Sequence, residues 1–118
     1  MSVSEHQLGY SALSQGTLSM EVAPSTDSCD VRLRGELDIE VAPAVEAELM
    51  RLLRGPSGVV CVDLSQLEYI DSIGLRCLLR IVRASEGGDG KVTFHRPSGE
   101  VARILELTKL SDALPFNE

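Results

Sequence analysis

Apolar and polar residues alternate in the first third of the sequence as a half-buried strand requires. Residues 18–22 (LSMEV) follow this pattern, and residues 31–34 (VRLR) repeat it just before Gly35. Between them, residues 24–28 (PSTDS) have the composition of a turn. The pattern predicts two strands joined as a hairpin, with the second strand ending at Gly35.

The apolar period changes to that of a helix after Val41. The residues that recur on one helical face are Val45, Leu49, Leu52 and Leu53. Pro43 suits the first turn of a helix, and Gly55-Pro56 is expected to end it. We therefore expect the first helix between Val41 and Gly55.

Two more strands and two more helices follow. The apolar run at residues 59–62 suits a strand covered on both faces, and residues 91–95 form the last strand. A second helix opens at Asp71-Ser72 and ends near Gly87-Gly88, and a third helix has Ser98 as its cap. The order β-β-α-β-α-β-α predicts an α/β fold, with a small mixed sheet on which helices pack.

The length of 118 residues suffices for one domain. Residues 1–17 show no sustained apolar period and are rich in Ser, Gly and Gln. We interpret residues 1–17 as a mobile N-terminal arm and residues 18–118 as a single domain.

The charge balance excludes several classes of partner. Eleven Lys and Arg residues stand against 18 Asp and Glu, which gives a formal net charge of -7. Such a chain repels phosphate backbones and anionic membrane surfaces. With two Tyr, two Phe and no Trp, it also offers few rings on which bases could stack. We expect no direct nucleic-acid partner and no membrane attachment.

The sequence gives no sign of export or of a metal site. No apolar run approaches the length of a bilayer, and the first residues lack the basic and apolar regions of an export signal. The three cysteines form no CxxC pair and no cluster with His. These features predict a cytoplasmic protein with reduced thiols, no metal and no cofactor.

The second predicted helix is apolar around most of its circumference. One arc holds Leu75, Leu78, Leu79 and Val82, and a second flank holds Ile73, Cys77 and Ile81. The remaining polar strip consists of Ser72, Arg76, Arg80 and Arg83. Either the second flank packs beside another helix, or it forms a partner site. The arginine strip is either a solvated face or a binding face.

Ser72 or Asp71 is expected to cap this helix, a contribution of about 1 kcal/mol. The position also suits modification. A phosphate on Ser72 would add a charge of roughly -1.5 to -2 at the positive end of the helix dipole, and Arg76 one turn later could pair with it. The helix would therefore tolerate a phosphate, whereas a docked partner would not.

A second concentration of charge lies between residues 36 and 48. The acids there, without any Lys or Arg among them, are Glu36, Asp38, Glu40, Glu46 and Glu48. They form either a solvated surface or an acidic patch that steers a basic partner.

Four segments of the sequence carry a family resemblance. They are residues 35–43 (GELDIEVAP), 59–64 (VVCVDL), 69–75 (YIDSIGL) and 105–110 (LELTKL). Together, in this order, they resemble the STAS domain, and most closely the free-standing bacterial anti-sigma-factor antagonists. The resemblance implies a small mixed sheet with helices packed on one side.

The resemblance also implies a function, that of a partner switch. The unphosphorylated antagonist binds an anti-sigma factor that is also a serine kinase, and so frees a sigma factor. The kinase phosphorylates a Ser that aligns with Ser72, the complex separates, and a phosphatase resets it. Asp71 and Gly74 match the flanks of that Ser, and Asp38 matches the acidic residue of the first motif. On this basis Asp38, Asp71, Ile73, Gly74 and Arg76 are expected to form the partner-binding site.

Three residues depart from the family pattern. Ile73 stands where a second Ser is common, so Ser72 is the only hydroxyl in its motif. Val41 stands where Ser or Thr often caps the first helix, so that cap must come from elsewhere. Lys109 replaces a common Gly after the third helix, which puts the usual left-handed ending in doubt.

Two other functions compete with the switch. A small STAS-like protein could be a constitutively docked subunit of a lipid-transport ATPase complex. An enzyme could use Ser72, His95 and Asp71 as a triad, but Asp71 adjoins Ser72 and is poorly placed to orient His95. No GxSxG or Walker motif is present. We therefore expect no catalytic residues. Cys77 could add redox sensitivity, although a buried structural thiol is the simpler interpretation.

Overall fold

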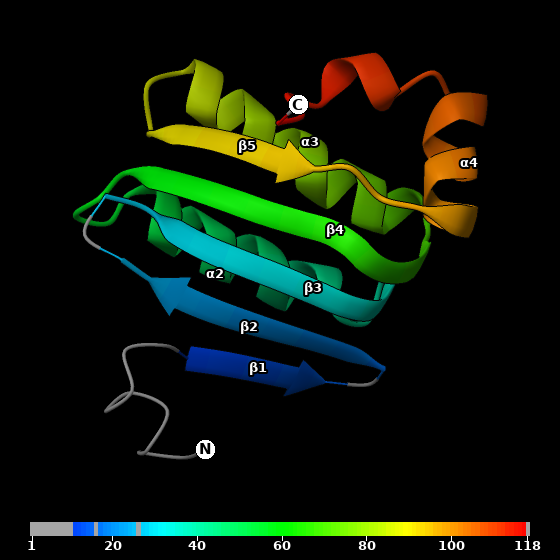
Figure 1. The fold of residues 1–118 in the computed structure, drawn as a ribbon, viewed down its shortest axis with the longest axis horizontal. Helices are drawn as coiled ribbons and strands as arrows, with labels where there is room; N and C mark the ends of the chain where they lie inside the picture. Colours follow the sequence, from blue (N-terminus) through cyan, green and yellow to red (C-terminus); the bar gives the residue numbers. More distant parts are fainter. Residues whose placement is uncertain (1–10, 16, 26, 118) are drawn as a thin grey trace.

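The computed structural model describes residues 11–15, 17–25 and 27–117, and its centre is a five-stranded sheet (Figure 1). The strands are β1 (Ser11–Gln15), β2 (Leu18–Pro24), β3 (Cys29–Leu37), β4 (Val59–Ile70) and β5 (Lys91–His95). They lie in chain order across the sheet. β1, β2 and β3 are antiparallel neighbours, whereas β3, β4 and β5 are parallel. The predicted hairpin and the mixed α/β sheet are confirmed.

A helix connects each pair of parallel strands, and another follows β5. The helices are α2 (Ala42–Leu53), α3 (Ser72–Glu86) and α4 (Gly99–Leu107), followed by the short 3-10 helix η1 (Ser111–Ala113). α2 and α3 lie side by side against one face of the sheet, while α4 stands at the end of the sheet and packs against β4 (Figure 1). The expectation of helices on one side of the sheet is therefore confirmed.

The core lies between the sheet and the α2–α3 layer. β2, β3, β4 and β5 contribute inward-facing residues to it, such as Met20, Leu33, Val62 and Phe94, all fully buried. The register brings these side chains together, because Met20 pairs with Leu33 and Val62 pairs with Phe94. Burying side chains of this size contributes about 1.5–3 kcal/mol each, which makes this layer the main source of stability.

The first strands of the sheet differ in extent from the sequence analysis. Ser11–Gln15 form β1 beside β2, so the expectation of a mobile arm is wrong for these residues. Residues 1–10 and 16 of that arm lie outside the described residues. β3 continues past Gly35 to Leu37 through a break in register. Gly35 has a φ of 104°, and a Cβ there would lie 1.9 Å from the carbonyl oxygen of Thr17. Gly35 is therefore a bulge residue inside the strand rather than its end.

β4 is longer than expected. The apolar run predicted a strand at residues 59–62, but β4 extends to Ile70. Its second half buries Leu64, Leu67 and Ile70, every third residue, because the register with β3 shifts twice along this stretch. The irregularity hides the strand period from a sequence search.

The ends of α4 also differ from expectation. Ser98 occupies the N-cap position, but its hydroxyl makes no cap bond and donates instead to the carbonyl of Ser65 at 3.4 Å. At the other end Lys109 has a φ of 60°, so the left-handed ending is kept without glycine. The N–H of Lys109 donates to the carbonyl of Glu106, and that of Leu110 donates to the carbonyl of Leu105. These two bonds define a Schellman motif.

Candidate functional site

The candidate site lies where β3 and β4 end side by side. Leu37 pairs with Ile70 in the parallel register, so the loop after β3 and the start of α3 meet at the same edge of the sheet. The N–H of Asp71 donates to the carbonyl of Leu37 at 3.2 Å, which extends the strand pairing by one bond. Loops at the carboxyl ends of parallel strands are a common place for binding sites.

The Asp71 side chain joins the two segments. One carboxylate oxygen accepts the N–H of Gly74 at 2.8 Å and caps α3. The other accepts the N–H of Ile39 at 3.0 Å, in the loop after β3. Asp71, and not Ser72, is therefore the cap, and it also fixes the position of the neighbouring loop.

Asp38, the first residue after β3, organises the same loop from within. Its carboxylate accepts the N–H of Glu40 at 3.0 Å, and its backbone carbonyl accepts the N–H groups of Val41 and Ala42 at 3.1 and 2.8 Å. Val41 occupies the N-cap position of α2 and makes no side-chain cap bond. The Asp38 carbonyl accepts the first N–H groups of the helix in its place. Asp38 thus acts on the backbone of its own loop, an arrangement typical of an Asx turn.

Gly74 is required by close packing. A Cβ on Gly74 would lie 2.4 Å from the carbonyl oxygen of Leu37 and 2.9 Å from Cγ1 of Ile70. Only a residue without a side chain lets the first turn of α3 approach the ends of β3 and β4 so closely. Gly74 therefore positions the site and is itself buried.

Ser72 is the first residue of α3 and is exposed. Its hydroxyl forms no hydrogen bond with any residue that the structure describes. Asp71 occupies the N–H of Gly74, which leaves the N–H groups of Ser72 and Ile73 at the helix end without an intrahelical acceptor. Arg76 follows one turn later, exposed and without an ion pair to another described residue. Ser72 is thus accessible in a locally positive setting.

The second apolar flank of α3 packs mainly beside α2. Cys77 and Ile81 are buried there, at 1% and 0% exposure, so helix packing explains most of the wide apolar arc. Ile73 is only partly buried and borders a groove between the two helices. Burial is the largest influence on Cys77, followed by the charge of Glu46, and they raise the pKa of its thiol to about 12 against the smaller effect of Arg80. A neutral, buried thiol is a poor redox sensor.

The acidic segment at residues 36–48 is partly neutralised within the molecule. Glu48 pairs with Arg51, and Glu46 pairs with Arg80 at 3.6 Å. Glu36 accepts a hydrogen bond from the Thr17 hydroxyl at 3.2 Å. These contacts agree better with a solvated charged surface than with an acidic patch for steering.

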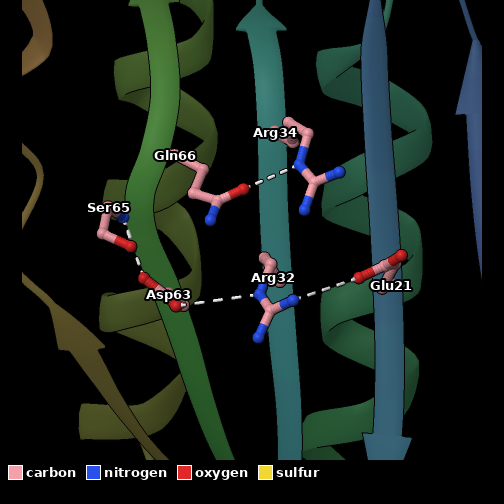
Figure 2. Close-up of polar contacts among 6 residues, drawn as sticks. All are labelled: Glu21, Arg32, Arg34, Asp63, Ser65 and Gln66. Atoms are coloured by element: carbon pink, nitrogen blue, oxygen red, sulfur yellow. Dashed lines mark hydrogen bonds and ion pairs between the residues drawn. The ribbon is translucent and has the colours of Figure 1, made fainter.

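The uncovered face of the sheet carries a polar network that the sequence analysis missed. Arg32 lies between Glu21 at 3.6 Å and Asp63 at 3.9 Å, on three neighbouring strands (Figure 2). Arg34 donates to Gln66 at 2.7 Å. The alternation of charged residues along residues 30–34 was a signal for an exposed strand face. Arg32 thus lies between two carboxylates, so the charged side chains of this face are held to one another by ion pairs.

The structure separates the residues of the hypothetical triad. His95 pairs in register with Asp63 on β4, whereas Ser72 follows Ile70 at the far end of that strand. Seven residues of strand correspond to roughly 20 Å, so His95 cannot accept a proton from Ser72. Across the described ranges no group of three His, Cys, Asp or Glu side chains could hold a metal ion. None of the described helices combines the length and apolar character of a membrane span.

Comparison with known families identifies the fold. The sequence profile described as "Mlab, STAS domain" matches residues 20–115. The chain belongs to the STAS domain family. The resemblance seen in the four sequence segments is therefore confirmed, as is the STAS fold.

STAS proteins similar to this chain include bacterial regulators. The chain is 28% identical over 101 residues to the anti-sigma-B factor antagonist of Staphylococcus epidermidis. The aligned region covers 86% of this chain and 94% of the relative. The Staphylococcus aureus protein of the same name is 27% identical over the same shares.

Two solved structures show the same fold. Unphosphorylated SpoIIAA, an anti-sigma factor antagonist, has a TM-score of 0.68 at 21% identity, covering 84% of this chain and 88% of that one. An anti-sigma factor antagonist from Mycobacterium paratuberculosis has a TM-score of 0.70 at 24% identity, covering 88% and 89%.

Proposed function

We propose that this STAS protein is an anti-sigma-factor antagonist whose binding is switched by phosphorylation of Ser72. The unphosphorylated form binds an anti-sigma factor with serine kinase activity and so releases a sigma factor. Phosphorylation separates the two proteins, and a phosphatase restores binding. The names of the Staphylococcus relatives support the antagonist role. The observation that carries the switch is the exposed Ser72 at the start of α3, with its hydroxyl free for a kinase.

The start of α3 favours modification without unfolding. A phosphate on Ser72 would meet the N–H groups at the helix end and could accept hydrogen bonds from Arg76 one turn later. Asp71 already holds the cap bond and the loop, so neither depends on the Ser72 hydroxyl. The helix therefore accommodates the new charge, and the main effect falls on a partner docked over the site.

The proposed partner surface combines residues that are accessible with residues that shape it. Ile39 is 63% exposed in the loop that Asp71 holds, an unusual position for a large apolar side chain unless a partner covers it. Ser72, Ile73 and Arg76 belong to the first turns of α3, which Asp71 joins to that loop. Asp38, Asp71 and Gly74 act through the backbone geometry of the surface rather than through direct contact. This is the chemistry of a docking site and not of catalysis.

Incubation with a purified anti-sigma factor of the serine-kinase type and ATP tests the proposal. Intact mass should show the addition of one phosphate, and peptide mapping should place it on Ser72. Ser72→Ala should remain unmodified, whereas Ser25→Ala, a matched change at another exposed serine, should be modified like the wild type. Phosphate on a residue other than Ser72, or none at all, would exclude the switch.

A STAS subunit docked constitutively on a lipid-transport ATPase is the second candidate. It is retained because the matching profile carries the Mlab name rather than that of an antagonist. It uses the same surface without modification. Co-purification with membrane ATPase subunits, together with an unphosphorylated Ser72 in cells, would favour it over the switch.

A further inference from the structure

A groove separates α2 and α3 on their exposed side. Its volume is about 340 Å³, and its walls are mostly small or apolar. The residues that form it are Ala42, Pro43, Glu46, Ala47, Met50, Ile73, Arg76 and Arg80. Because Pro43 and Ala47 are small and exposed, a partner's backbone can approach α2 closely along this groove.

Basic side chains line the α3 edge of the groove and continue along the same face of the helix beyond it. Arg76, Arg80 and Arg83 recur at intervals of four and three residues, which places them on one face of the helix. Arg80 is offset by Glu46 across the groove, with 3.6 Å between their charged atoms. Arg76 and Arg83 form no ion pair with another residue in the described part of the chain. Two guanidinium groups on this edge therefore remain available for acids from outside.

We infer that this groove receives an amphipathic helix of the partner protein, with apolar side chains in the groove and acidic side chains facing Arg76 and Arg83. The inference rests on the proposed function and specifies the chemistry of its partner. A helix fits because its i and i+7 positions lie on one face about 10 Å apart, which matches the seven-residue spacing of Arg76 and Arg83 on α3. Acidic residues fit because a charge facing the unpaired arginines gains attraction, whereas a basic residue there is repelled.

The position of Ser72 links the groove to the switch. Ser72 begins the helix that carries the arginine edge, and Arg76 lies four residues further on. A phosphate on Ser72 would compete with the partner's acid for Arg76 and would repel that acid at the same time. Phosphorylation would therefore weaken the partner's ion pair with Arg76, in addition to blocking contact at Ser72 itself.

Three synthetic helical peptides of about 18 residues, or five turns, test this inference. The first carries Leu along one face and Glu along the adjoining edge. The second replaces each Glu with Lys, and the third replaces each Leu with Ser. Binding of labelled peptide is measured by fluorescence anisotropy. The first peptide should bind at least tenfold more tightly than either of the others.

Protein variants locate the binding. Arg76→Glu and Ala47→Arg, both at exposed positions, should each weaken the first peptide at least tenfold. Lys91→Glu, which makes the same charge change at the start of β5, should leave binding unchanged. Equal binding of the Glu and Lys peptides, equal loss in Lys91→Glu and Arg76→Glu, or no binding of the first peptide would each overturn the inference. Since no phosphorylation takes place in this assay, its failure leaves the Ser72 switch intact, and failure of the switch leaves the peptide result intact.

Discussion

The carboxylate of Asp71 accepts the peptide N–H of Ile39 at 3.0 Å, across 32 positions of sequence. With its other oxygen, Asp71 caps α3 through Gly74. A single side chain therefore sets the orientation of the loop that exposes Ile39 and of the helix that begins at Ser72. The proposed docking surface depends on this one carboxylate, while Ser72 remains free to change its charge.

Asp71→Asn should destabilise the protein by about 1–2 kcal/mol. The amide can replace only one of the two acceptor oxygens, and its NH2 group would face a backbone donor. Urea unfolding followed by circular dichroism measures the change. Ser72→Ala, one residue away and exposed, should stay within about 0.5 kcal/mol of the wild type. Equal stability of Asp71→Asn and the wild type would show that the bond to Ile39 adds little.

Gly74→Ala should be much more damaging than an ordinary glycine replacement in a helix. The added methyl would lie 2.4 Å from the backbone carbonyl of Leu37, which cannot move without disturbing β3. We expect a loss of about 2 kcal/mol or more in unfolding free energy, although alanine normally favours a helix. The control is Gly87→Ala, whose nearest contact would be an ordinary 3.4 Å. If the two variants unfold alike, close packing at Gly74 is not the reason for glycine.

Lys109→Gly should stabilise the protein by about 0.5–1 kcal/mol. Lys109 holds a φ of 60°, which costs an L-residue about 1–2 kcal/mol, and part of this is returned by the greater freedom of glycine in the unfolded chain. Thermal and urea unfolding measure the gain. Lys109→Ala loses the same charge but keeps the strained geometry, so it should not be stabilised. A gain in both variants would point to charge rather than to backbone strain.

Acid should remove the contribution of Asp63 to stability. Burial, the largest single influence, acts to raise the pKa of Asp63, but hydrogen bonds from Ser65 and the charges of His95 and Arg32 together lower it. A carboxyl with a lowered pKa stabilises the fold fully above its unfolded pKa of about 3.9, and this stability is lost as the pH falls through the folded value.

The matched variant for this prediction is Asp63→Asn. It should be less stable than the wild type at pH 6, and the difference in unfolding free energy should shrink as the pH falls below about 4. Asp27→Asn, an exposed change in the turn after β2, should show no comparable trend. A difference for Asp63→Asn that stays constant from neutral to acid conditions would contradict the assignment.

Local patterns predicted most of the fold because the apolar spacing of a strand or helix can be recognised from neighbouring residues alone. The alternation at residues 18–22 and 31–34 gave the hairpin, and the helical period after Val41 gave α2. The missed parts depend on distant partners. β1 is a strand because β2 offers its edge to it, and β4 continues beyond Val62 because β3 follows it through two register shifts.

The candidate site could be predicted as a list of residues but not as a geometry. The motif around Ser72 pointed to Asp71, Gly74 and the helix start. It could not reveal that Asp71 binds Ile39, because such a bond depends on β3 and β4 ending at the same edge. The same holds for Gly74, whose small size matters only against Leu37. The open face around Arg32 was missed since its partners lie on two other strands.

We propose that phosphate on Ser72 controls partner binding, and calorimetry with the kinase-type anti-sigma factor measures this effect. The protein is compared in its unmodified form and after stoichiometric phosphorylation on Ser72, without ATP during the titration. The unmodified protein should bind, and the phosphorylated protein should bind at least a hundredfold more weakly, since like charge in a docked interface costs several kcal/mol. Equal affinity of the two forms would show that phosphate on Ser72 does not control binding.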